Sequence, residues 1–283
     1  MLDSEGVERR RRQNLTRRIY TSKGPNFLIH VDGYDKLKRF GFAIHGAMCG
    51  YSRRVLWLMV ARTNNNPQVV ASYFLDYMKE IKGVPRCVRM DAGTENVVIE
   101  DIQKSFRWED ADDMSAEKSV IIGSSYSNQR IERWWRWARQ GGCQYWMDLF
   151  LNLEMTGHLS TSNELHLECA RFCFMDILQK ELDRVRMEWN QHQISRNDNI
   201  SVPCGKPDIM FYMPSLYGTF DYKMSVDQTD IEAIQQQCQV PFSLGCREDV
   251  HRLLSTHMSD MNLRRPSTIE EALSLFEKLA GHF

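Results

Sequence analysis

The chain has 283 residues, of which 42% are hydrophobic and 26% are charged, and its formal net charge is −1. These values are typical of a globular protein and exclude a uniformly basic nucleic-acid-binding protein. No apolar run approaches the roughly 20 residues that cross a bilayer, and the first residues lack the apolar stretch of a secretory signal. We therefore expect an intracellular protein with no membrane partner.

Charge is unevenly distributed along the chain. Residues 1–24 carry seven basic and three acidic side chains, a net charge of +4, whereas residues 219–283 carry six basic and ten acidic ones, a net charge of −4. The first segment is typical of a basic arm or a nuclear-import signal, and equally of a solvated disordered end. We predict a basic arm at 1–24, a folded core at 25–215, a small helical region at 216–283, and a nuclear location.

The first third of the chain predicts three strands and a helix. Runs rich in β-forming residues occupy 26–32, 40–49 and 54–61. Their short connections predict an antiparallel meander. Asn66 and Pro67 then supply a cap and a first helical residue for a helix that ends at Gly83.

Strands and helices alternate further along. We predict strands at 86–90 and 118–122, and helices at 96–106, 127–152, 161–191 and 267–281. Polar residues at 160–163 are good caps for the longest helix. This order of elements predicts an α/β fold with a mixed sheet flanked by helices and a mostly helical C-terminal extension.

Three acids stand at the ends of predicted elements. Asp32 ends the first strand, Asp91 follows the fourth, and Glu132 lies one turn into a long helix. Any one of them alone is more often a surface or capping residue. Together they favour a metal site, because converging carboxylates repel one another unless cations neutralise them. Hard oxygen ligands suit Mg²⁺ or Mn²⁺, and two such ions can drive in-line phosphoryl transfer.

The segments HVDGYDKLKRFGF, RCVRMDAGTEN and SSYSNQRIERWWRW resemble the three blocks of the integrase core of DDE transposases and retroviral integrases. The amino-acid sequences of these segments are similar to those encoded by the transposon-derived integrase-core genes of eukaryotic genomes. The resemblance covers about 25–215 and implies a five-stranded, ribonuclease-H-like fold. It also implies that Asp32, Asp91 and Glu132 are catalytic ligands of two Mg²⁺ or Mn²⁺ ions. We interpret the acidic loop 108–117, between the second and third acids, as solvated surface and not as extra ligands.

The resemblance extends to DNA contacts around Glu132. The family has a polar stretch before the glutamate, and here Asn128 and Gln129 occupy it, so we expect them to cap the helix and touch the DNA end. Arg136 and Arg139 follow Glu132 by four and seven residues and share its helix face. The match implies that they contact phosphates. The alternative is that they pair with Glu132 or with surface acids.

Residues after the second acid have simpler interpretations. We expect Gly93 to let the chain turn sharply after Asp91, and Asn96 to cap the next helix. Glu95 is either a group that supports the site or a helix-start charge.

Several other polar and aromatic residues are expected to be structural. His30 shares a strand face with Asp32, and we favour a packed, hydrogen-bonded histidine over one beside the metals. A helix that packs on a sheet uses tryptophans mainly as core, which we favour over a base-stacking platform for Trp134, Trp135 and Trp137. Cys169 and Cys173 are expected to be buried thiols and not zinc ligands.

The leading hypothesis is a metal-dependent polynucleotidyl transferase that processes and joins DNA ends. The alternatives are a simple nuclease of the same fold, and a catalytically silent module that binds DNA or protein. By analogy with integrases we expect a homo-oligomer. The sequence has no counterpart of the zinc-binding and SH3-like domains of retroviral enzymes. We therefore expect a complete site without the apparatus that selects DNA ends.

Overall fold

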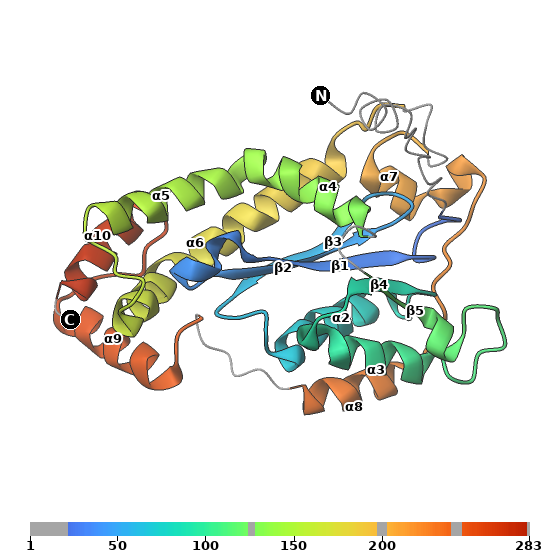
Figure 1. Ribbon diagram of the computed structural model, residues 1–283, viewed down its shortest axis with the longest axis horizontal. Coiled ribbons are helices and arrows are strands. Elements are labelled where there is room, and N and C mark those ends of the chain that lie inside the picture. Colours follow the sequence, from blue (N-terminus) through green and yellow to red (C-terminus); the bar gives the residue numbers. More distant parts are fainter. Residues whose placement is uncertain (1–21, 124–127, 197–202, 239–244, 282–283) are drawn as a thin grey trace, which may run out of the picture.

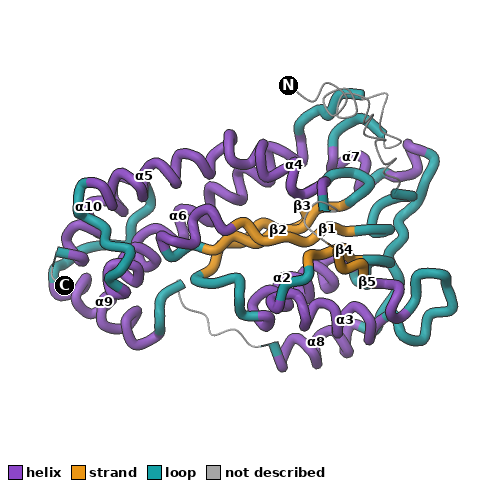
Figure 2. The backbone as a smooth tube through the Cα atoms, in the orientation of Figure 1, coloured by secondary structure: helices purple, strands orange, loops and turns teal. Residues whose placement is uncertain are grey.

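The computed structural model describes residues 22–123, 128–196, 203–238 and 245–281, and its centre is a five-stranded sheet with helices on both faces (Figures 1 and 2). The strands are β1 (Ile29–Tyr34), β2 (Ala43–Cys49), β3 (Val55–Ala61), β4 (Val88–Asp91) and β5 (Val120–Gly123). The α-helices are α2 (Pro67–Ile81), α3 (Val97–Phe106), α4 (Gln129–Ala138), α5 (Gln144–Met155), α6 (Glu164–Gln191), α7 (Pro207–Tyr212), α8 (Gln228–Gln237), α9 (Glu248–Asp260) and α10 (Ile269–Ala280).

The strand order is β3-β2-β1-β4-β5. β1 pairs antiparallel with β2, and β2 with β3, which confirms the predicted meander. β4 pairs parallel with β1 on its other side, and β5 pairs parallel with β4. Helix α2 makes this arrangement possible, because it carries the chain across one face before β4 begins. The mixed sheet flanked by helices confirms the predicted ribonuclease-H-like α/β fold.

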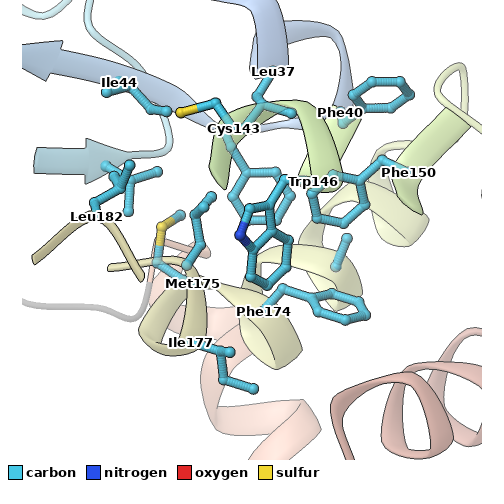
Figure 3. Packing of buried hydrophobic residues seen from close by; sticks show 14 of the residues in the cluster. Leu37, Phe40, Ile44, Cys143, Trp146, Phe150, Phe174, Met175, Ile177 and Leu182 are labelled. Atoms are coloured by element: carbon cyan, nitrogen blue, oxygen red, sulfur yellow. The ribbon is translucent and has the colours of Figure 1, made fainter. Parts of the chain in front are cut away.

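Strand alternation divides the interior into two cores. On one face, Ile44 and Leu58 join the side chains of α4, α5 and α6. On the other face, Val31 and Ala47 pack with the side chains of α2 and α3. Figure 3 shows the aromatic centre of the first core, where side chains of α5 and α6 meet those of the sheet side. Each fully buried aliphatic or aromatic side chain of this kind stabilises the fold by about 1.5–3 kcal/mol.

The predicted helix starts are confirmed by side-chain caps. The Asn66 side chain accepts a hydrogen bond from the Gln68 N–H at the start of α2, with Pro67 as the first helical residue. The Asn163 side chain caps α6 in the same way. α10 starts with a reciprocal capping box between Thr268 and Glu271.

The long helix predicted at 127–152 is interrupted. α4 ends at Ala138, a π-helical turn follows over Arg139–Cys143, and α5 begins at Gln144. Gly142 lies in this turn against α6, where an added Cβ would come within 2.8 Å of the Glu181 carboxylate. A larger residue here would displace the Glu181 side chain, and the helical hydrogen-bond ladder is interrupted at the same place.

The acidic loop 108–117 is more than solvated surface. Arg107 is fully buried and its guanidinium pairs with Asp110 and Asp112. Asp112 and Asp113 also pair with Arg86. Two of the loop's acids thus neutralise a buried cation, which a charge pattern alone does not reveal.

The C-terminal helices pack at two separate places. α9 and α10 contact α6, and α8 contacts α2 (Figure 1). Cys169 and Cys173 are buried free thiols on α6, as predicted. Residues 1–21 of the predicted basic arm lie outside the described residues. Within the described part of the chain, no helix combines the length and the apolarity that a membrane crossing needs.

Candidate active site

The sheet places two of the three predicted acids side by side. β1 and β4 run parallel, and His30 is paired with Arg89. Continuing that register by two residues sets Asp32 beside Asp91, on the same face of neighbouring strands that lie about 4.8 Å apart. Both acids are half-buried. The strand order therefore brings together residues that are far apart in sequence.

Helix α4 adds Glu132 over the same face of the sheet. The helix contacts β1 and β2 and is attached to β1 by two hydrogen bonds. Near its start, Asn128 Nδ2 donates to the Val31 carbonyl oxygen at 2.9 Å, and one turn past Glu132, Trp135 Nε1 donates to Asp32 Oδ2 at 2.8 Å. Glu132 lies four residues after the first contact and three before the second, so it shares the helix side that faces β1.

The three carboxyl groups influence one another electrostatically. Burial raises the pKa of Asp32 to about 7; the hydrogen bond from Trp135 opposes this, and the charges of Asp91 and Glu132 add to it. Burial also raises the pKa of Asp91, with a contribution from Glu95. The pKa of Glu132 is raised by burial and by Asp91, against a lowering effect of Arg136. The site thus concentrates negative charge that a proton or a cation would relieve.

The carboxylate oxygens of these acids suit a hard divalent cation, although the three side chains are not arranged around a single ion. Among the described residues, no three His, Cys, Asp or Glu side chains are placed to hold one ion together. Mg²⁺ is commonly bound by one or two carboxylates, with water and substrate phosphate completing its shell. The Asp91 Oδ1 atom is buried and has no hydrogen-bond partner in the described part of the chain, so this acceptor is available to such an ion.

The turn after Asp91 differs from the prediction in its details. Gly93 has φ −119° and ψ 147°, so it is not needed for an unusual backbone conformation. An added Cβ would lie 2.0 Å from the Glu95 carboxylate, so a larger residue here would displace the Glu95 side chain from its present position. Asn96 does not cap α3 through its side chain; its Nδ2 donates to the Asp91 carbonyl oxygen and to Glu95. Glu95 therefore lies close to the site.

Asn128 is an internal connection and not a helix cap. Its side chain is 1% exposed and makes no capping hydrogen bond to α4. Its Oδ1 lies 2.7 Å from His30 Nδ1, and its amide nitrogen reaches Val31. The predicted cap is wrong, and burial leaves this side chain out of reach of DNA. His30 is fully buried, with a pKa lowered to about 3 by burial, which agrees with a packed, neutral histidine.

The other predicted DNA-binding residues lie on the surface of α4 and of the π-helical turn that follows it. Gln129, Arg136 and Arg139 are exposed. Arg139 Nε donates to Gln144 Oε1 at 2.6 Å, which holds its guanidinium at the start of α5. Arg136 lies close enough to Glu132 to lower the pKa of that acid. The helix therefore presents a basic surface beside the acids, while contact with DNA stays a prediction.

The tryptophans of α4 belong to the core, as predicted, and one has a further contact. Trp134 and Trp135 are buried, and Trp137 packs partly buried against Trp189. The hydrogen bond from Trp135 to Asp32 is a contact that sequence reasoning missed. Trp135 follows Glu132 by three residues on α4, and this helical spacing is the sequence signal that could have placed Trp135 near the site.

The sheet order and the flanking helices are those of the ribonuclease-H-like core of the polynucleotidyl transferase superfamily. Residues 19–205 match the family described as the integrase core domain. Because this match spans more than half of the 283 residues, the chain belongs to that family, the catalytic core of the retroviral integrase superfamily. The family generally uses divalent metals and binds DNA. No curated protein matches the chain.

Proposed function

We propose that the protein is a metal-dependent polynucleotidyl transferase that processes DNA ends and joins them to other DNA, as a transposon-derived integrase core. The observation that supports this most directly is the placement of Asp32 beside Asp91 on two neighbouring parallel strands, with Glu132 on the helix that covers the same face. Burial is the main cause of the raised pKa of each acid, and neighbouring carboxylates add to it, which a bound cation would relieve.

In this proposal Asp32, Asp91 and Glu132 hold two Mg²⁺ or Mn²⁺ ions. When bound, the ions would activate an attacking hydroxyl or water and stabilise the leaving oxygen. The protein orients the acids through the hydrogen bonds of Asn128 and Trp135, which fix α4 against β1. Partial burial keeps bulk water from weakening the field of these charges.

We further propose that Gln129, Arg136 and Arg139 bind the DNA backbone. All three are exposed, Gln129 and Arg136 on α4, which carries Glu132, and Arg139 in the turn directly after it, so a phosphate held there would lie near the acids. The protein would work in the nucleus and, by analogy with integrase relatives, as a homo-oligomer.

The test is an assay of end cleavage and strand transfer on labelled DNA with Mg²⁺ or Mn²⁺. Asp91→Asn should reduce both activities at least 100-fold, because it removes a metal ligand while keeping its size. Asp101→Asn, an exposed acid on α3, is the matched control and should keep full activity. Equal activity of wild type and Asp91→Asn would overturn the catalytic proposal.

The same assay separates the two alternative functions. Hydrolysis without joining would identify a nuclease that uses water in place of a DNA hydroxyl. DNA binding that requires neither metal nor Asp91 and leads to no cleavage would identify a silent binding module.

A further inference from the structure

Helix α4 carries an indole as well as an acid into the site. Trp135 is 6% exposed, and its Nε1 donates to Asp32 Oδ2 at 2.8 Å. Other indoles have different partners: the buried Trp57 donates to His45, and the partly buried Trp189 donates to the Arg53 carbonyl oxygen. Trp135 is the one described tryptophan whose recorded hydrogen bond reaches an acid of the site.

The strand beside Asp32 leaves room for this ring. Gly46 on β2 is the cross-strand partner of Asp32, so a side chain at that position would project from the same face. A Cβ there would lie 3.0 Å from Cη2 of Trp135. Gly46 is not among the glycines with positive φ, so its backbone does not require glycine. A side chain at this position would crowd the indole of Trp135, which would have to shift to make room for it.

An aromatic neighbour holds the ring in place. Tyr34, two residues beyond Asp32 on the same strand face, stacks on Trp135 with ring centroids 5.0 Å apart and an interplanar angle of 27°. Packing therefore fixes the orientation of the indole, and its N–H points at Asp32 Oδ2.

The choice of a neutral donor has a chemical consequence. Asp32 is close enough to Asp91 and Glu132 to be repelled by both, so its side chain needs a partner to stay in position. A lysine or arginine would supply that partner but would also cancel the charge that attracts a cation. An indole N–H orients the carboxylate and leaves its negative charge intact.

We propose that Trp135 is a positioning residue that fixes the Asp32 carboxylate for divalent metal binding, with Gly46 providing the space for its ring. This inference rests on the proposed function, because it takes Asp32 as a metal ligand. Trp135 also ties the spacing of Asp32 to the helix that carries Glu132, so the two acids are held relative to each other.

The experiment measures Mn²⁺ affinity from the electron paramagnetic resonance signal of the free ion. Trp135→Phe keeps an aromatic ring and loses the donor, and it should weaken Mn²⁺ binding about 10-fold. Trp134→Phe is the matched control, since this buried neighbour has an Nε1 without a hydrogen-bond partner among the described residues. It should bind Mn²⁺ like the wild type. Thermal unfolding in EDTA checks that each variant is folded.

Two further measurements apply if Trp135→Phe does not fold. Gly46→Ala keeps the indole but displaces it, and it should also weaken Mn²⁺ binding. In the wild type, Mg²⁺ should shift one indole ¹H–¹⁵N signal more than the other tryptophan signals, and Asp32→Asn should abolish that response. An indole spectrum that Mg²⁺ leaves unchanged would overturn the inference.

The outcomes separate the inference from the function on which it rests. Wild-type Mn²⁺ affinity in Trp135→Phe, together with lost binding in Asp32→Asn, would overturn the role of Trp135 alone. A wild-type protein that binds no Mn²⁺ would overturn the proposed function, and the inference with it. Weakened binding in Trp135→Phe but not in Trp134→Phe would support both.

Discussion

His30 Nδ1 and Asn128 Oδ1 lie 2.7 Å apart in the interior and join strand β1 to the start of helix α4. Asn128 also donates to the carbonyl oxygen of Val31. Because β1 carries Asp32 and α4 carries Glu132, this connection sets the distance between two acids of the site. A residue expected at the DNA surface thus acts inside the fold.

Asn128→Ala should lower the free energy of unfolding by about 1–3 kcal/mol, because His30 and the Val31 carbonyl oxygen each lose a hydrogen bond to Asn128 in a buried place. Urea denaturation at pH 7.5 measures the change. Gln129→Ala, at the adjacent exposed position, serves as the control and should change stability by less than about 0.5 kcal/mol. Equal effects of the two substitutions would contradict the structural role of Asn128.

Asp32→Asn should stabilise the metal-free protein. Burial raises the pKa of Asp32 from 3.8 to about 7, so between these values the unfolded chain loses a proton that the folded chain keeps. The contribution of Asp32 to stability therefore falls as the pH rises through this range. At pH 8 in EDTA, the variant should exceed the wild type by about 1–3 kcal/mol. The gain should vanish below pH 4, and a gain that is independent of pH would contradict the prediction.

The pair Arg136→Glu and Arg139→Glu should weaken DNA binding and flatten its salt dependence. Each phosphate contact contributes about 0.9 to the slope of log affinity against log salt, so the slope should fall by about 2. Fluorescence anisotropy with labelled DNA at several salt concentrations provides the measurement. Arg252→Glu, an exposed change on α9, is the control for net charge. An unchanged slope in the double variant would remove both arginines from the interface.

His45 should make the protein less stable in mild acid. It is fully buried, accepts a hydrogen bond from Trp57 Nε1, and has its pKa lowered by burial from 6.5 to about 3. Below pH 6.5, His45 is protonated in the unfolded chain but stays neutral in the folded chain. The free energy of unfolding therefore falls as the pH drops toward 3.

Replacing His45 should remove part of the loss of stability at acidic pH. His45→Gln should reduce the slope between pH 6 and 5 by about 1.4 kcal/mol per pH unit, measured by urea denaturation. His158→Gln, at an exposed position, should leave the slope unchanged. Identical slopes for wild type and His45→Gln would refute a neutral buried His45.

Local patterns were sufficient for most of the elements. Alternation and β-forming residues identified the strands, and Asn66 and Asn163 marked helix starts because a cap acts within three residues of the chain. The interruption at Gly142 was not predicted, although this glycine lies against Glu181 and Val185 of α6, neighbours that are distant in the sequence.

The sequence by itself determined the order of strands and helices, the three acids, and the family resemblance they carry. Only the tertiary structure decided that β4 lies beside β1, that Asn128 faces inward, and that Trp135 donates to Asp32 across Gly46. Capping and periodicity depend on neighbours along the chain, which a sequence records. Burial and cross-strand space depend on residues that folding brings together, which a single sequence does not record.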